Sequence, residues 1–111
     1  MYPSTKGTLE FRQVISDWLK NRFMLKDIDP NTQVLSANGT REALFAFAQA
    51  TIDRENNPLI LIPNPFYQIY EGAALLSGAR LHFLDCNEAT GFLTDFSSVT
   101  AKVWDACQLI Y

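Results

Sequence analysis

An Asn-Gly pair at residues 38–39 joins two segments of different hydrophobic period, and it constrains the fold more than any other feature of the chain. Val34 to Ala37 before it is a short apolar run, whereas apolar residues after it recur at helical spacing. This pattern predicts a strand that enters a helix through Gly39, where the lack of a Cβ allows a tight turn. The free backbone N–H groups of Thr40 and Arg41 at the start of such a helix can hold a phosphate.

The rest of the chain alternates between strand-like and helix-like patterns with short connections. Leu59 to Ile62 is a continuous apolar run between prolines, which predicts a strand covered on both faces. The alternation predicts the α/β class with a mostly parallel sheet. The expected elements are a helix at about 8–25, a strand at 33–37, a helix at 40–54, a strand at 59–62, a helix at 67–77, a strand at 80–84, a helix at 96–104 and a strand at 107–111.

The local patterns also predict how two of these helices begin and end. The first helix is expected to be amphipathic, with Thr8 as its N-cap. Its apolar positions are Phe11, Val14, Ile15, Trp18 and Leu19. Gly78 is expected to follow the end of the third helix as its C′ residue.

Composition excludes several classes of function. The length of 111 residues fits one domain, and 48% hydrophobic with 19% charged residues is ordinary for a globular protein. A net charge of −3 gives no electrostatic footprint for nucleic acid or an anionic membrane. No apolar run approaches the roughly 20 residues that span a bilayer. Cys86 and Cys107 are expected to be free thiols in a reducing cytoplasm.

A second signal lies about two dozen residues after the Asn-Gly pair, where Phe66 and Tyr67 follow the predicted strand at 59–62. Ligands of open α/β sheets gather at the carboxyl ends of the strands, and an aromatic ring there can stack on a flat heterocycle. Taken singly, the glycine turn could be ordinary helix capping, and the aromatic residues could simply pack the start of a helix. Together they favour a ligand that is both phosphorylated and planar.

No residue of the chain is predicted to be catalytic or to bind a metal. His82 alternates with apolar neighbours in a predicted strand and is expected to be structural. The lysines occupy polar or amphipathic settings that would not lower a lysine pKa. They are Lys6, Lys20, Lys26 and Lys102.

In their order and spacing, these segments resemble the pyridoxal-phosphate-dependent aminotransferases of fold type I, class I/II. The resemblance covers almost the whole chain. It is carried by four segments: Tyr2 to Gly7 with the helix that follows, Asn38 to Leu44, the Pro-x-Pro-x-Tyr-x-x-Tyr run of Pro63 to Tyr70, and Gly78-Ala79. The residue sequence of the second and third segments is particularly similar to that of the succinyldiaminopimelate transaminases of lysine biosynthesis.

The resemblance implies a fold and a role for particular residues. The chain would be the N-terminal part of a three-layer α/β/α large domain. Gly39, Thr40 and Arg41 would bind the phosphate of pyridoxal 5′-phosphate, and Tyr67 would stack on its ring. Tyr2 would reach the cofactor of the neighbouring subunit, because the family is homodimeric. The full enzyme would be cytoplasmic and act on amino acids and keto acids, with glutamate as amino donor.

The resemblance also implies that the chain is a fragment. The family's Schiff-base lysine, the aspartate that pairs with the ring nitrogen and the substrate-binding arginine would all follow Tyr111. The chain alone is therefore expected to be inactive. The alternative is a non-catalytic α/β module that binds a phosphorylated ligand or a protein partner.

Overall fold

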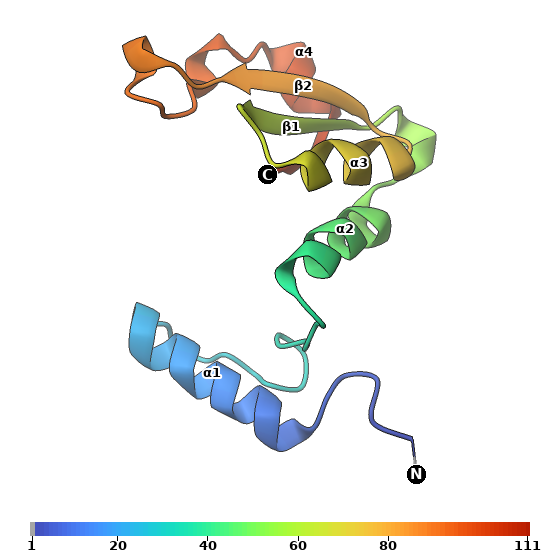
Figure 1. Cartoon of the computed structure of the whole chain (residues 1–111), viewed down its shortest axis with the longest axis vertical. Coiled ribbons are helices and arrows are strands. Elements are labelled where there is room, and N and C mark those ends of the chain that lie inside the picture. The colour runs from blue at the N-terminus through green and yellow to red at the C-terminus, as the bar shows by residue number, and fades with distance from the viewer. Residues whose placement is uncertain (1) are drawn as a thin grey trace. The chain divides into compact units, whose positions relative to one another are not determined.

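The computed structural model describes residues 2–111 and divides the chain into two compact units, one ending at Asn38 and the other spanning Gly39–Tyr111. The expectation that the chain is part of one large domain stays a prediction. All three strands of the sheet belong to the second unit, so the first unit is organised by its own helix and loop. Figure 1 labels the elements within each unit.

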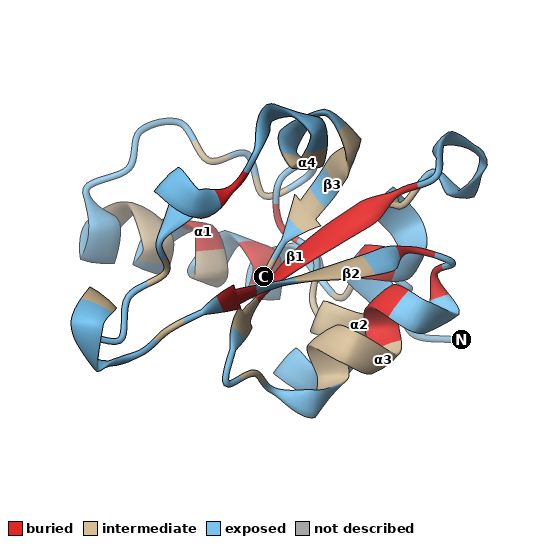
Figure 2. Cartoon of the chain, turned by 90° about the horizontal axis from the view of Figure 1, so that it is seen from above, coloured by how far each residue is buried: buried red, intermediate tan, exposed pale blue. Residues whose placement is uncertain are grey.

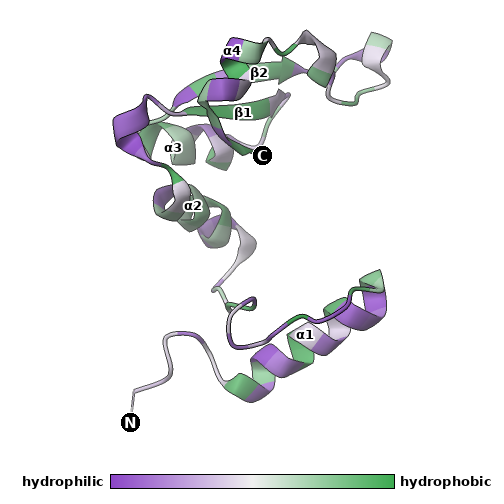
Figure 3. Ribbon diagram, turned by 180° about the vertical axis from the view of Figure 1, so that it is seen from behind, coloured by the Kyte–Doolittle hydropathy of each residue, from purple (hydrophilic) through white to green (hydrophobic). Residues whose placement is uncertain are grey.

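The first unit contains α1, Leu9–Phe23. Its N-cap is Thr8, as predicted, because the Thr8 hydroxyl oxygen accepts a hydrogen bond of 3.2 Å from the backbone N–H of Phe11. The helix ends at Met24, whose φ of 55° places it in the left-handed region. Figure 3 shows polar and apolar residues mixed along α1.

The face that α1 buries is not the predicted apolar face. Phe11, Val14 and Trp18 are all more than half exposed, whereas Arg12 and Ser16 are buried. The Ser16 hydroxyl donates to the carbonyl of Ile28 at 2.8 Å, and the Arg12 guanidinium donates to the carbonyl of Pro30. Polar side chains occupy this face because the loop that returns along it presents backbone carbonyls that need donors.

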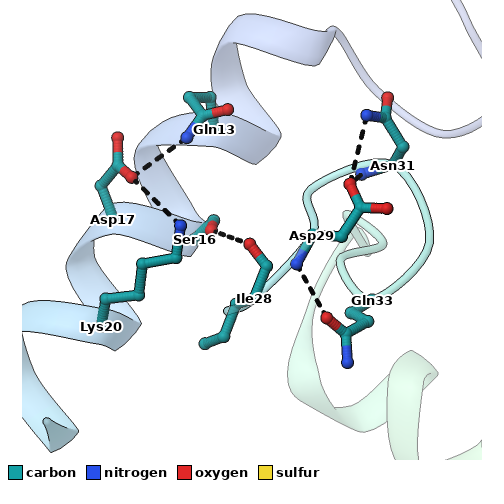
Figure 4. A network of polar contacts seen from close by, with 8 residues as sticks. All are labelled: Gln13, Ser16, Asp17, Lys20, Ile28, Asp29, Asn31 and Gln33. Atoms are coloured by element: carbon teal, nitrogen blue, oxygen red, sulfur yellow. Dashed lines mark hydrogen bonds and ion pairs between the residues drawn. The ribbon is translucent and has the colours of Figure 1, made fainter. Parts of the chain in front are cut away.

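The loop after α1 is ordered by its own polar network, of which Figure 4 draws the bonds of Asp29 with Asn31 and Gln33. The Asp29 carboxylate accepts hydrogen bonds from the backbone N–H of Asn31 at 2.8 Å and from the hydroxyl of Thr32 at 2.8 Å. The Asp29 N–H donates to the side chain of Gln33 at 2.7 Å. The hydrogen bonds that the carboxylate accepts, first from the backbone of Asn31 and then from Thr32, hold the pKa of the Asp29 carboxyl below its usual value.

The predicted strand at 33–37 is absent from the described residues. Val34 is buried, but the segment pairs with none of the three strands. A strand exists only where a neighbouring strand satisfies its backbone N–H and C=O groups, and this segment has no such neighbour here. Periodicity alone could not reveal that.

The second unit holds a parallel sheet in the order β2-β1-β3. Its elements are α2 (Thr40–Thr51), η1 (Arg54–Asn56), β1 (Leu59–Asn64), α3 (Gln68–Leu76), β2 (Arg80–Asp85), η2 (Glu88–Thr90), η3 (Phe96–Ser98), α4 (Ala101–Ala106) and β3 (Cys107–Ile110). The predicted helix at 96–104 is thus two short helices. Val99 between them is buried and has an extended backbone, which interrupts the helical path.

The central strand β1 is covered on both faces, as its apolar run predicts. Ile60 and Ile62 pack against alanines of α2 and α3, whereas Leu59 and Leu61 pack on the α4 side. Residues 59–62 are all buried, and Figure 2 shows β1 as the most continuously buried strand. The unit is therefore a three-layer α/β/α arrangement, in which the carboxyl end of β1 leads directly to Tyr67.

The glycine that ends α3 offers a test of this fold. Gly78 has a φ of 81°, and its N–H donates to the carbonyl of Leu75 at 3.1 Å, which confirms it as the residue that closes the helix. Gly78→Ala is expected to lower the free energy of unfolding by about 1 kcal/mol, because a Cβ is strained in this region. Gly72→Ala inside α3 is the matched control, since nothing lies within 4 Å of the added Cβ.

Urea unfolding measures both variants. Gly72→Ala should raise the free energy of unfolding by about 0.5–1 kcal/mol, because alanine is the better helix former. Equal effects of the two substitutions would contradict the left-handed conformation at Gly78.

Candidate functional site

The first turn of α2 presents uncapped backbone donors. The first intrahelical hydrogen bond at this end runs from the N–H of Ala43 to the carbonyl of Gly39 at 3.1 Å. The N–H groups of Thr40, Arg41 and Glu42 therefore have no acceptor within the helix. No side chain among the described residues caps this end. The turn thus has the free amides and the positive helix end that an anion requires.

Gly39 is needed for this turn. Its φ of 154° is one that other residues rarely adopt. A Cβ on Gly39 would lie 2.6 Å from Oε2 of Glu42, so the carboxylate of Glu42 lies beside the turn.

Tyr67 lies next to this turn. It is the residue before α3, just beyond the carboxyl end of β1, and the peptide bond between Asn64 and Pro65 is cis. Arg41 Nε donates a hydrogen bond of 2.9 Å to the hydroxyl oxygen of Tyr67. The Arg41 guanidinium carbon also lies over the Tyr67 ring, 5.7 Å from its centre, so Arg41 contacts both the hydroxyl and one side of the ring. Tyr67 is 41% exposed, which leaves ring surface free for a ligand.

The structure therefore brings four of the five candidate residues together: Gly39, Thr40 and Arg41 in one turn, and Tyr67 through its bond to Arg41. The fifth, Tyr2, lies in the first unit and is 97% exposed.

Two further tyrosines extend this arrangement. Tyr67 and Tyr70 meet edge to face, with ring centres 5.8 Å apart. Tyr70 stacks on Tyr111, with ring centres 4.4 Å apart and planes within 9°. The Tyr-x-x-Tyr spacing could have revealed the first pair, because residues three apart share a helix face. No sequence signal points to Tyr111, which follows β3 and is 41 positions from Tyr70 in the chain.

Tyr111 is held by its hydroxyl, which donates to the carbonyl of Leu44 at 2.6 Å. Burial, and then the neighbouring Tyr70, raise the pKa of Tyr111 above its usual value of 10.0. The neutral phenol is therefore favoured in the folded chain. The stability that Tyr111 contributes is complete below pH 10.0 and is lost as the pH rises through the raised pKa.

A comparison of the unaltered chain with Tyr111→Phe tests this pH dependence. The difference between their free energies of unfolding should be constant from about pH 8 to about pH 10 and should shrink above that. Urea unfolding across this range measures it. A difference that stayed the same to about pH 11 would show that the hydroxyl is not held as described.

The carboxyl ends of β1 and β2 carry a polar pair that the sequence patterns missed. Asn64 Nδ2 donates to Asp85 Oδ1 at 2.8 Å, and the N–H of Cys86 donates to the carbonyl of Asn64 at 2.9 Å. The pair fixes the edge of the sheet from which Tyr67 emerges.

The lysine side chains of the described residues lie at the surface or are partly exposed. Lys6, Lys26 and Lys102 are exposed, and Lys20 lies 3.8 Å from Asp17. The described residues contain no group of three or more histidine, cysteine or acidic side chains suited to a metal. Cys86 and Cys107 are free thiols. In the same residues, no helix combines the length and apolarity needed to cross a bilayer.

Comparison with known proteins decides the family. The model of the family described as "Aminotransferase class I and II" matches residues 1–110. The chain belongs to the class I and II aminotransferases. These aminotransferases depend on pyridoxal phosphate, as the resemblance implied.

Individual relatives agree with this assignment. The chain is 33% identical over 110 residues to the LL-diaminopimelate aminotransferase of Aquifex aeolicus, covering 99% of this chain and 28% of that protein. Its fold matches the crystal structure of an aminotransferase from Neisseria meningitidis with a TM-score of 0.88 and 43% identity, covering 99% of this chain and 28% of the other. An aminotransferase from Helicobacter pylori matches with a TM-score of 0.86 and 31% identity, covering 99% and 28%.

These comparisons set the extent of the conclusion. The chain spans a little more than a quarter of the length of the relatives it matches. The curated relatives at 29–34% identity bear the name LL-diaminopimelate aminotransferase. The residues of the Asn38 and Pro63 segments, by contrast, indicated the succinyldiaminopimelate transaminases. The family and the fold follow from the comparisons, and the substrate does not.

Proposed function

We propose that this chain forms part of the pyridoxal phosphate site of an aminotransferase. The N–H groups of Thr40 and Arg41 after Gly39, with the Thr40 hydroxyl, would hold the phosphate, and Tyr67 would stack on the ring. The observation that carries the proposal is the 2.9 Å hydrogen bond from Arg41 to Tyr67, which sets the ring beside uncapped helix amides. A ligand with a phosphate at one end and a flat ring at the other fits both groups.

The residues of this site bind and orient, and they perform no proton transfer. Pyridoxal phosphate itself supplies the electron sink for amino-group transfer. The first turn of α2 offers donors to the phosphate, and Arg41 holds the Tyr67 hydroxyl so that the ring keeps its direction. The Glu42 carboxylate lies beside Gly39, so we expect it to move away from a phosphate bound at this helix end.

We further propose that Tyr2 reaches the phosphate of a neighbouring subunit in a homodimer. The exposure of the Tyr2 side chain supports this role, because such a residue must be free to contact another copy. The full enzyme would belong to the cytoplasm.

For the whole protein that contains this chain, we propose transfer of the amino group of glutamate to N-succinyl-2-amino-6-oxopimelate in lysine biosynthesis. The Asn38–Phe45 and Pro63–Tyr70 segments support this substrate. The second candidate is LL-diaminopimelate, which the names of the curated relatives favour. Both substrates share one carbon skeleton, so the choice depends on recognition of the succinyl group.

An assay of the whole protein with each substrate separates the two candidates. Glutamate-dependent conversion of the succinylated keto acid, without turnover of LL-diaminopimelate and 2-oxoglutarate, is the expected result. The opposite preference would establish the second candidate. Turnover of neither would contradict both.

The 111-residue chain by itself is expected to be inactive. Its lysines are exposed or paired at the surface, so none is placed to react selectively with the cofactor. Borohydride treatment in the presence of pyridoxal phosphate, followed by mass spectrometry, should find only scattered, substoichiometric modification. A stoichiometric adduct at a single lysine would overturn this expectation. Selective phosphate binding without any affinity for the pyridine ring would favour the non-catalytic module.

A further inference from the structure

A continuous series of contacts leaves α2 at Arg41, passes through three tyrosines and returns to α2 at Leu44. It begins at Arg41, which donates to Tyr67, and continues through the rings of Tyr70 and Tyr111. It ends at the carbonyl of Leu44, which accepts from the Tyr111 hydroxyl. We call Tyr67, Tyr70 and Tyr111 the tyrosine bridge.

The two ends of the bridge lie on the same helix, three residues apart. Arg41 and Leu44 both belong to α2, whereas the bridge residues come from the start of α3, from α3 itself and from the position after β3. A closed series of contacts restrains the ring of Tyr67 from two directions. One restraint is the hydrogen bond at its hydroxyl, and the other is the edge-to-face contact with Tyr70.

The far end of the bridge is held by packing on one side and by a hydrogen bond. Tyr70 and Tyr111 border an open apolar cavity, lined also by Ala43, Leu44, Phe47, Leu109 and Ile110. Both rings also pack against the buried core around Ile60, and the Tyr111 ring is held further by its stack with Tyr70 and its hydroxyl bond to Leu44. The hydroxyl is thus the contact that closes the bridge.

We infer that Tyr70 and Tyr111 are positioning residues that set the spacing between the α2 amides and the Tyr67 ring. The inference rests on the proposed function, because it concerns a ligand that contacts both groups at once. Neither residue would touch that ligand. They would select for the distance between its phosphate and its ring.

Two probes of different reach test this spacing in the 111-residue chain. Inorganic phosphate can engage only the α2 amides, whereas pyridoxamine 5′-phosphate can engage the amides and the Tyr67 ring together. NMR titration follows the amide signals of Thr40 and Arg41 and the ring signals of Tyr67, and it measures weak binding as well as strong. The readout is the ratio of the two dissociation constants.

Tyr111→Phe keeps the stacked ring and removes the bond to Leu44. It is expected to raise the dissociation constant for pyridoxamine 5′-phosphate about fivefold, with that for inorganic phosphate unchanged within about twofold. Tyr70→Leu should raise the same dissociation constant about tenfold. Tyr70→Phe keeps the ring and should bind pyridoxamine 5′-phosphate as the unaltered chain does. Phe96→Leu is the matched control. It removes another aromatic contact of the same unit, that with Trp104, and should change neither constant.

The outcomes separate the inference from the proposed function. Equal weakening of both probes in Tyr111→Phe, or no change in either, would overturn the positioning role and leave the binding site intact. Failure of the unaltered chain to shift the Thr40, Arg41 and Tyr67 signals with either probe would overturn the proposed function, and the inference with it.

Discussion

Ile60→Ala is expected to lower the free energy of unfolding by about 2–5 kcal/mol, the usual range for such a truncation in a packed core. Ile60 is completely buried in β1, where it packs with alanines of α2 and α3. Alanine neighbours are too small to fill the space left by the lost carbons, so a cavity remains. A loss of this size is a large fraction of the total stability of a small domain.

Urea unfolding of Ile60→Ala, beside Leu93→Ala, measures this effect. Leu93 is 72% exposed in the loop after β2, and its truncation should change the free energy of unfolding by less than about 0.5 kcal/mol. A loss below about 1 kcal/mol at Ile60 would show that β1 is not the covered central strand described here.

Tyr67→Ala is expected to weaken binding of pyridoxamine 5′-phosphate by roughly tenfold. An aromatic stack contributes about 0.5–1.5 kcal/mol beyond the area it buries, and 1.4 kcal/mol corresponds to a factor of ten. Tyr67 is 41% exposed and borders the uncapped end of α2, so its ring is available to a ligand held there. Fluorescence or NMR titration measures the change.

A second ligand and a second variant serve as controls for this prediction. Inorganic phosphate should bind Tyr67→Ala as it binds the unaltered chain, because the α2 amides remain. Tyr67→Phe retains the ring and loses the hydroxyl that accepts from Arg41. Its affinity for pyridoxamine 5′-phosphate should therefore lie between that of the unaltered chain and that of Tyr67→Ala. Unchanged affinity of Tyr67→Ala for pyridoxamine 5′-phosphate would exclude stacking on this ring.

Local sequence signals predicted those features whose cause is local. The cap at Thr8 and the left-handed Gly78 follow from the chemistry of single residues. The buried run of residues 59–62 follows from uninterrupted apolar character. Tyr67 could be placed at the carboxyl edge of the sheet because it closely follows β1. The same argument does not place Thr40 and Arg41, because the segment before α2 is not a strand of the sheet.

Features that depend on distant partners could not be predicted. The segment 33–37 has an apolar pattern but no neighbouring strand among the described residues, and no pattern within it reveals that. The side of α1 that is buried depends on carbonyls of the following loop, which attract Arg12 and Ser16. Tyr111 meets Tyr70 only after β3 has joined the sheet beside β1.

The substrate was the least accessible feature. The segments present here carry the proposed cofactor site, and none of their side chains is assigned to an amino acceptor. The residue sequence of two segments indicated the succinylated substrate. The relatives named for LL-diaminopimelate, however, are identical to this chain at about a third of the aligned positions.

A crystal structure of the chain with bound pyridoxamine 5′-phosphate tests the central claim most directly. We expect the phosphate to accept hydrogen bonds from the N–H groups of Thr40 and Arg41, with Glu42 turned away and the pyridine ring lying on Tyr67. A phosphate at that turn with its ring directed away from Tyr67, or a ligand bound elsewhere on the chain, would contradict the account.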